Sequence, residues 1–433
     1  MIPLLSNNEL VGEARIRFFR RSQADIDSVM EKTKEWIHRI QKKRDSALLE
    51  YIRQFDDPQF SLENLRVSPV DIKRAYEALP SETLEVLQKQ IALSRAFHGE
   101  QARRVFADRQ WEMETTSGVR VGCKKVSMAS IGLYVPAGSA PLPSTAQLLT
   151  IAAKCAEVPR IAVFFPPTGL HPEIIVAADI AGADEIYRVG GIAAIAAMAY
   201  GTESIASVDK IAGPGSPWVQ AAKQCVFGEV GIDIIAGPSE GLLLADETAN
   251  AKWLAADILA RCEHGVDSCM PLVTSSHHLA ESVQCELAQQ LSKCGRKKII
   301  EKAFQNGYNG ILLVSSEEEM ILFANEYGAE HLHICTEFPE RIFQKITNAG
   351  SIFLGHLTSV PLGDYATGTN HTLPTGRAVR FSSPVGVETF VKTLQFQEVR
   401  NDGLLELAPI VEALADVEGL DAHKNAVLLR LTS

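Results

Sequence analysis

An alternation of short apolar segments with longer alanine-rich segments limits the possible folds of this chain more than any other feature. Between about residues 140 and 236 the helix-like segments AQLLTIAAKCAEV, HPEIIVAADIAG and IAAIAAMAYG are separated by RIAVFFPP and DEIYRVG and followed by VDKIAG. Short runs rich in Val, Ile and Phe, without polar alternation, are typical of parallel strands buried on both faces. The alternation predicts a compact nucleotide-binding-like domain with a parallel sheet between helices.

A second series of the same kind begins at IDIIAGPSEGLLLAD and ends near SIFLGH. It contains the helix-like segments AKWLAADILARCEHG and LAESVQCELAQQLSK and the strand-like segments MPLVTSS and GILLVSS. We expect a second α/β unit here. The two series show no aligned repeat that would prove a duplication. Residues up to about 105 carry Glu, Lys, Arg and Leu at helical spacing, and the tail from about 382 also has a helical pattern.

A chain of 433 residues exceeds the usual size of one hydrophobic core, so more than one domain is expected. The fold class predicted is α/β, with two Rossmann-like domains that have parallel-sheet cores, a helical N-terminal region and a helical C-terminal tail. The expected division is an arm over 1–25, a discontinuous domain over 26–139 and 237–381 that carries most site residues, a second domain over 140–236, and the tail over 382–433.

Composition excludes several classes of protein. Hydrophobic residues make up 46% of the chain and the formal net charge is −11. No basic stripe suited to nucleic acid is present, because clusters such as QKKR lie in amphipathic helical stretches. No apolar run reaches the roughly 18 residues of a membrane span, and the start MIPLLSNNEL lacks the pattern of a signal peptide. We therefore expect a cytoplasmic protein. Its eight cysteines show no CxxC spacing, which argues against disulfides and against a cysteine zinc cluster.

The densest group of polar residues is GDYATGTNHTLPTG, from Gly363 to Gly376, in which Asp364 and His371 lie among Gly, Thr and Asn. Functional side chains concentrate in loops of this kind, held by a rigid scaffold. A turn that only caps a strand is the alternative interpretation.

A second candidate is EYGAEHLHICTE, where Glu330 precedes His331. A carboxylate and an imidazole could supply two bases, one to deprotonate an alcohol and one to activate water. On a turn such neighbours converge, whereas on a strand they point to opposite faces. Taken alone, the dipeptide is better explained as a solvated turn.

Weaker signals come from three further motifs. In RCEHGVDS, Arg261 and His264 stand three residues apart at an apparent helix end, where the imidazole either reaches a cleft or caps the helix dipole. The turn GPGS, from Gly213 to Ser216, could offer backbone amides to a phosphate, but it lacks the third glycine of GxGxxG. The turn GPSE, from Gly237 to Glu240, is equally ambiguous.

Together, YVPAGSAPLPST, VDKIAGPGS, IDIIAGPSE, CEHGVDS, YGAEHL, GDYATGTNHTLPTG and AHKNAV resemble the histidinol dehydrogenase family in order and spacing over nearly the whole chain. The resemblance implies NAD-dependent oxidation of L-histidinol through L-histidinal to L-histidine, with one zinc ion, in a homodimer whose active sites are shared between subunits. It implies that His331 accepts the alcohol proton and that Glu330 activates water for attack on the aldehyde.

The resemblance also assigns binding residues. It places His264, Asp364 and His423 at zinc ligands, and Tyr134, Ala193 and Ser216 at positions that contact NAD. The residues expected around the substrate are Ser239, His264, His331, Asp364, His371, Glu418 and His423. Since Glu418 and His423 lie in the tail, they are expected to reach the partner subunit's site.

Three positions depart from the family. Ala193 and Ser216 stand where the family has Gln and Asn, which removes two amide groups from the expected NAD site. Arg261 replaces the glutamine that is the fourth zinc ligand, and a guanidinium has no lone pair to donate. Either Arg261 swings aside and zinc keeps three protein ligands, or the guanidinium occupies the metal position and pairs with Asp364. The second arrangement would suit a relative that oxidises another, anionic hydroxy compound. A catalytically silent homologue is a further alternative.

Overall fold

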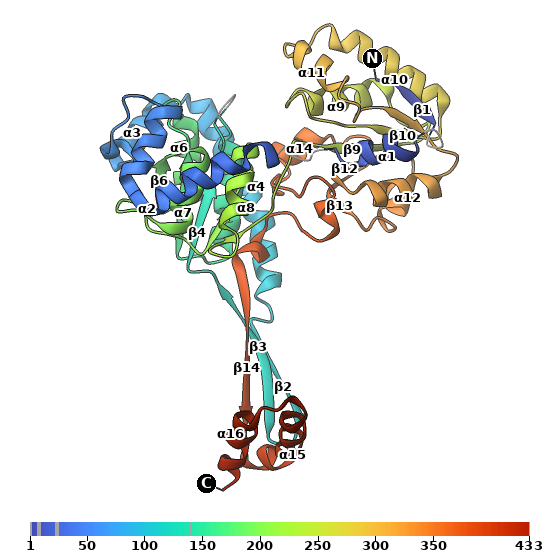
Figure 1. Cartoon of the computed structure of the whole chain (residues 1–433). Helices are drawn as coiled ribbons and strands as arrows, with labels where there is room; N and C mark the ends of the chain where they lie inside the picture. The colour runs from blue at the N-terminus through green and yellow to red at the C-terminus, as the bar shows by residue number, and fades with distance from the viewer. Residues whose placement is uncertain (1, 7–9, 22–25, 138–140, 433) are drawn as a thin grey trace.

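The computed structural model of the chain describes residues 2–6, 10–21, 26–137 and 141–432. Two α/β domains lie side by side, and a long antiparallel ribbon extends away from both of them (Figure 1). Both domain sheets are parallel throughout, which confirms the predicted fold class. None of the helices in the described ranges is both long and apolar enough to cross a membrane.

The first domain has a five-stranded sheet of order β6-β5-β4-β7-β8. The chain order of the strands reverses between β4 and β7, so the loops that leave these two strands diverge at the carboxyl edge of the sheet. Ligands of open α/β sheets bind at such a point. The strands are β4 (Ser130–Tyr134), β5 (Arg160–Phe165), β6 (Glu185–Arg188), β7 (Lys210–Ala212) and β8 (Gly231–Ile232), and the connecting helices are α5 (Pro143–Cys155), α6 (Pro172–Ala181), α7 (Gly191–Tyr200) and α8 (Pro217–Val226).

The N-terminal helices α2 (Met30–Phe55), α3 (Pro69–Ala78) and α4 (Ser81–Val105) form an outer layer on this same domain. The apolar face of α2 packs against α7, whose sequence GIAAIAAMAY contains no charge and is almost wholly buried. Residues 26–139 were expected to form one domain with residues 237–381, but their helices pack against the 140–236 domain. Helices α2 to α4 and strand β4 complete the 140–236 unit, because apolar α5 to α7 require cover on their outer sides.

The second domain has a six-stranded sheet of order β1-β11-β10-β9-β12-β13. The N-terminal arm is part of this domain, since β1 pairs with β11 and the phenylalanines of α1 pack on α12. The strands are β1 (Leu4–Ser6), β9 (Gly241–Ala245), β10 (Leu272–Thr274), β11 (Ile311–Leu313), β12 (Ala329–Cys335) and β13 (Ala349–Leu354), and the helices are α1 (Gly12–Phe19), α9 (Ala251–Cys262), α10 (His277–Leu291), α11 (Lys297–Ala303), α12 (Glu317–Tyr327), α13 (Pro339–Phe343) and α14 (Val360–Tyr365).

The ribbon that leaves the two domains is a three-stranded antiparallel sheet of order β14-β3-β2. It consists of β2 (Gln110–Thr116), β3 (Val119–Ser127) and β14 (Val391–Val399), and it carries α15 (Asn401–Glu418) and α16 (Asp421–Leu431) at its far end (Figure 1). The tail is thus helical as expected, but a nine-residue strand precedes its helices. Short 3₁₀ turns lie at Asp27–Val29, Leu62–Asn64, Ala378–Arg380 and Val387–Phe390.

Candidate active site

A cavity of about 510 Å³ lies between the two α/β domains and collects most of the motifs singled out above. The first domain lines it with the loops that leave β4 and β7 at the carboxyl edge of its sheet. The second domain lines it with the segments that precede β9 and β10 and with the first residues of β12, which lie at the amino edge. The carboxyl edge of one parallel sheet therefore faces the amino edge of the other across the cavity.

Glu330 and His331 are the second and third residues of strand β12, and both are buried, with 6% and 2% exposure. The interpretation of this dipeptide as a solvated turn is therefore wrong. The helix α12 ends at Gly328 in a left-handed conformation, with φ of 58°, and the strand begins at the next residue. Although they are strand neighbours, the carboxylate Oε2 of Glu330 lies 3.4 Å from Nδ1 of His331.

His331 lies between two carboxylates. Its Nε2 is 3.4 Å from Oδ1 of Asp364, which belongs to α14, and its ring stacks on Phe353. Burial and the charge of Arg261 both lower the pKa of His331, but the nearby carboxylates Glu330 and Asp364 outweigh them, and the net shift is upward. Burial raises the pKa of Asp364, but its contacts with His331 and Arg261 lower it further, so Asp364 is held as the carboxylate.

The main chain at Glu240 holds both bases. Its amide donates a 2.9 Å hydrogen bond to Oε2 of Glu330, and its carbonyl accepts one of 3.2 Å from Nδ1 of His331. The Glu240 side chain pairs with the fully buried Arg21, which also donates to the carbonyl of Tyr327 at 2.8 Å. The guanidinium of Arg21 lies over the Tyr327 ring. Sequence reasoning missed Arg21 altogether, because its partner Glu240 is 219 residues away.

His371 and His264 occupy the same cavity. The Nδ1 of His371 donates to the carbonyl of Asp364 at 3.1 Å, and its Nε2 lies 3.0 Å from the hydroxyl of Thr145 in the first domain. Burial lowers the pKa of His371. His264 follows the end of α9, where water reaches its ring through the cavity. The surrounding protein and then the charge of Arg261 lower the pKa of His264 to about 4. Both rings are therefore neutral at physiological pH.

Arg261, on the last turn of α9, projects into the cavity with only 4% of its surface exposed. Its Nη2 lies 3.6 Å from Oδ2 of Asp364. The structure therefore places Arg261, His264, Asp364 and His331 in one cavity, with Asp364 in contact with both Arg261 and His331. Ser239, from the turn before β9, also lines the cavity.

The residues expected to contact NAD do not lie together in the structure. In the turn between β7 and α8, Pro214 and Gly215 line the cavity, and Ser216 is exposed at the start of α8. The amide of Gly213 donates to Asp233 at 2.8 Å, and buried Lys223 donates to the carbonyl of Gly213 at 3.1 Å, which fixes the turn.

Tyr134 and Ala193 lie away from the cavity. The buried hydroxyl of Tyr134 accepts from the amide of Gly191 at 3.2 Å, which satisfies the first turn of α7. Ala193 is fully buried in the core beneath that turn.

Glu418 and His423 are exposed on the helices at the far end of the ribbon and do not line this chain's cavity. Of the three expected zinc ligands, only His264 and Asp364 meet here. Within the described ranges, no group of three or more His, Cys, Asp or Glu side chains is placed to hold a metal ion.

The family model for histidinol dehydrogenase matches residues 19–431. The chain is 39% identical over 426 residues to the histidinol dehydrogenase of Methanocaldococcus jannaschii, covering 98% of this chain and 97% of the other. It is 42% identical over 414 residues to that of Rhodopseudomonas palustris, with 95% and 94% covered.

Among solved structures, histidinol dehydrogenase from Elizabethkingia anophelis superposes with a TM-score of 0.91 at 36% identity, covering 100% of this chain and 98% of the other. Sequence and fold thus agree along the whole length, including the ribbon and tail. The chain belongs to the histidinol dehydrogenase family, a family of NAD-dependent oxidoreductases that act on an alcohol and its aldehyde.

Proposed function

We propose that this chain oxidises a primary alcohol through the aldehyde to the carboxylic acid, with NAD as the hydride acceptor and with Glu330 and His331 as the two bases. The observation that carries the proposal is the buried contact between these two side chains, held by the main chain of Glu240 at the wall of a cavity. An imidazole beside a carboxylate suits two consecutive oxidations, because the alcohol and the aldehyde hydrate each lose a proton as hydride departs.

In the first oxidation, His331 takes the hydroxyl proton of the alcohol. Asp364 and Glu330 favour the resulting imidazolium, because both carboxylates lie within 3.4 Å of its nitrogens. NAD, when bound, supplies the chemistry of accepting the hydride from carbon. In the second oxidation, Glu330 takes a proton from water as the water oxygen attacks the aldehyde carbon. The imidazolium of His331 gives its proton to the aldehyde oxygen, which completes the hydrate. The hydrate then loses a proton to His331 and a hydride, for which a second molecule of NAD would be the acceptor, and the acid remains.

The cavity wall from the first domain is the place proposed for NAD. The turn Gly213–Ser216 leaves the carboxyl end of β7 at the position where the strand order reverses, and helix α8 begins there with free amides. Ser216 is exposed at this position and can donate a hydroxyl. Ala193 offers no polar side chain, and the first amides of α7 are already bonded to the hydroxyls of Tyr134 and Tyr51, so the turn before α8 must supply more of the binding.

Zinc does not fit the donors that this chain assembles. The guanidinium of Arg261 lines the same cavity as His264 and lies 3.6 Å from Asp364, so a cation stands beside the two residues that would hold the metal ion. We therefore assign no step of the reaction to a metal ion.

L-Histidinol is the first candidate substrate, since the chain's curated relatives are histidinol dehydrogenases. A different hydroxy compound is the second candidate, and the contact of Arg261 with Asp364 favours it. A silent homologue is the third, motivated by Ala193 and Ser216. Failure to bind NAD at about millimolar concentration in calorimetry would support that third candidate.

We also propose a homodimer with shared sites. The tail helices expose Leu405, Leu414 and Val417, at 66%, 57% and 84%, while few of their residues are buried in this chain. In such a dimer, Glu418 and His423 of one subunit would lie near the cavity of the other subunit.

NADH formation from L-histidinol and from L-histidinal tests the proposal. The variants Glu330→Gln and His331→Asn should each lose at least about a hundredfold in kcat. Glu330→Gln should retain more of the alcohol step than of the aldehyde step, since water activation belongs to the second oxidation. His277→Asn, an exposed histidine on α10, is the matched control and should retain full activity. Full activity in both base variants would refute the assignment.

A further inference from the structure

The guanidinium of Arg261 is a buried cation without a hydrogen bond in the described part of the chain. Its Nε has no partner although the side chain is only 4% exposed, and its nearest anion, Oδ2 of Asp364, is 3.6 Å away, beyond hydrogen-bond length. The Nε–H is one of the five N–H donors of a guanidinium, and burying it without a partner costs free energy. The side chain lines the cavity, so a ligand there can accept these hydrogen bonds.

Arg21, which is fully buried, shows how a structural guanidinium is held in this protein, although its Nε also lacks a hydrogen bond. Arg21 pairs with Glu240 at 3.1 Å, donates to the carbonyls of Tyr327 and Gly328, and covers an aromatic ring. Arg261 has none of these main-chain contacts. The guanidinium instead lines the cavity, where a bound ligand can accept its hydrogen bonds.

The positive charge of Arg261 also disfavours the binding of a metal ion at this site. A divalent ion held by His264 and Asp364 would lie beside the guanidinium of Arg261, which is 3.6 Å from Asp364, and the two positive charges would repel each other.

We propose that Arg261 takes the place of the metal ion, so that this site works without a divalent metal and anchors its substrate through a carboxylate. This inference rests on the proposed function and names its substrate class, a short hydroxy carboxylate with a primary alcohol. The planar guanidinium matches a carboxylate in a two-point contact. The amine of an amino alcohol would instead bring an ammonium charge against Arg261.

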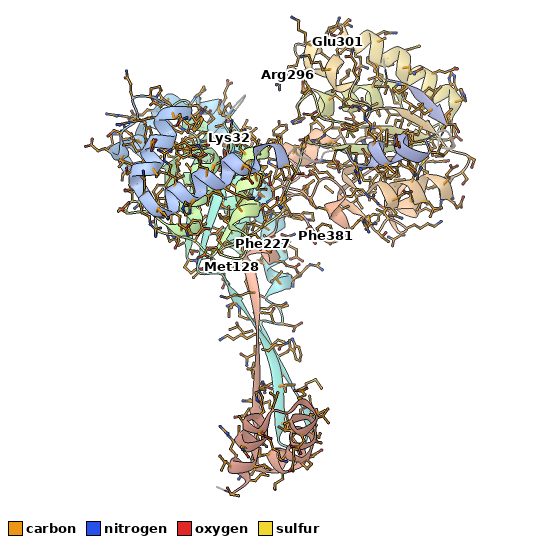
Figure 2. All side chains as sticks on the ribbon, in the orientation of Figure 1. Lys32, Met128, Phe227, Arg296, Glu301 and Phe381 are labelled. Carbon is orange, nitrogen blue, oxygen red and sulfur yellow. The ribbon has the colours of Figure 1, made fainter. Side chains whose placement is uncertain are left out.

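A second arginine supports an anionic substrate. Arg296, the residue before α11, lines the mouth of the same cavity. Figure 2 shows it on the side of its domain that faces the other α/β domain. An anion that enters the cavity passes this exposed cation and then meets the buried one, with His331 beside it to receive the alcohol proton.

The first experiment measures metal. The purified full-length chain is incubated with Zn²⁺, desalted, and analysed for bound metal. We expect less than about 0.1 equivalent in the wild type and no change of activity with a chelator. Arg261→Gln, which restores a neutral oxygen donor, should retain more zinc than the wild type. Arg341→Gln, an exposed arginine on α13, is the matched control and should bind none. A full equivalent of zinc in the wild type, with activity lost to chelation, would overturn the proposal.

The second experiment measures the binding of a carboxylate that cannot be oxidised. Butanoate carries the carboxylate and lacks the hydroxyl, and butanamide is its neutral counterpart, so calorimetry with both isolates the contribution of charge. We expect the wild type and Arg341→Gln to bind butanoate in preference to butanamide. The Kd of butanoate should rise at least about tenfold in Arg261→Gln and less in Arg261→Lys, which keeps the charge. Equal binding of butanoate by wild type and Arg261→Gln would overturn the proposal.

Turnover separates this inference from the proposed function. With 4-hydroxybutanoate and L-histidinol as substrates, we expect NADH from the hydroxy carboxylate and a KM effect of Arg261→Gln on that substrate. Zinc-dependent turnover of L-histidinol alone would overturn the role of Arg261 and leave the two-step oxidation intact. Arg261-dependent binding of butanoate, with no NADH from any alcohol or aldehyde, would instead support the anion site and refute the dehydrogenase.

Discussion

At the scale of single residues, the environment of His331 sets the pH at which the proposed alcohol oxidation begins. A base must be neutral to accept a proton, and the pKa of His331 is raised above the ordinary 6.5 by Glu330 and Asp364, against burial and Arg261. The acidic limb of kcat/KM should therefore lie above pH 6.5 and activity should rise through it.

Replacing one of these carboxylates should move that limb. Asp364→Asn removes a charge that raises the pKa of His331, so we expect the limb at lower pH, together with a lower maximum rate. Asp267→Asn removes a carboxylate from the same cavity without a contact to His331 and serves as the control. A limb that stays in place in Asp364→Asn would contradict the electrostatic role given to this residue.

Arg21 is predicted to support catalysis from outside the cavity. Arg21→Met leaves Glu240 buried without its cation, which should cost about 3–5 kcal/mol of unfolding free energy. Because Glu240 holds both bases through its main chain, kcat should fall while KM changes little. In urea unfolding, the double variant Arg21→Met/Glu240→Leu should recover part of the loss. A single variant as stable as the wild type would show that the pair contributes nothing.

At the scale of elements, the sequence predicted the helices and strands whose residues follow a regular apolar pattern. The alternation of apolar strands and alanine-rich helices was sufficient for both parallel domains, because the central strands, such as β5, β9 and β12, are buried on both faces. Strand β14 was missed because its residues, VKTLQFQEV, are polar and mostly exposed on a ribbon outside either core. Glu330 and His331 were misplaced in a turn because Gly328 ends α12 and β12 begins at once, which leaves no separate loop.

The turn between β7 and α8 gives a prediction at this scale. Gly213 has φ of 131°, and a Cβ there would lie 2.1 Å from the carbonyl oxygen of Tyr134. Gly213→Ala should therefore displace the turn and raise the KM for NAD at least about tenfold, with a smaller effect on the KM for the alcohol. Gly228→Ala also has positive φ but meets no atom within 4 Å, so it controls for backbone strain alone. Equal KM values for NAD in the two variants would refute a role for this turn.

At the scale of the whole molecule, the site depends on contacts that no local pattern contains. The cavity joins the carboxyl edge of one sheet to the amino edge of the other, so its residues come from segments across more than two hundred positions. Motif order predicted that Glu330, His331, Arg261, His264, Asp364 and His371 would meet. It could not predict which of them touch, nor the support from Arg21 and Glu240, since these follow from the packing of the second domain.

The ribbon and the tail bury too little hydrophobic surface to be stable on their own. Within α15 and α16 the described residues buried are Gly403, Ala408 and Ala415, whereas several leucines are exposed. Small buried residues contribute little hydrophobic free energy, so a partner subunit should cover the exposed faces. Light scattering should give a mass near twice 47.2 kDa.

Charges placed in the apolar face should separate assembly from folding. Leu414→Glu with Val417→Glu should yield a monomer whose two α/β domains remain folded by circular dichroism and whose activity is lost, because the partner's tail no longer reaches the cavity. Asn401→Glu with Asn425→Glu adds the same two negative charges to α15 and α16 at exposed positions that are already polar, and it should remain dimeric. A monomeric wild type with full activity would show that each chain completes its own site, and the exposed leucines would then need another partner.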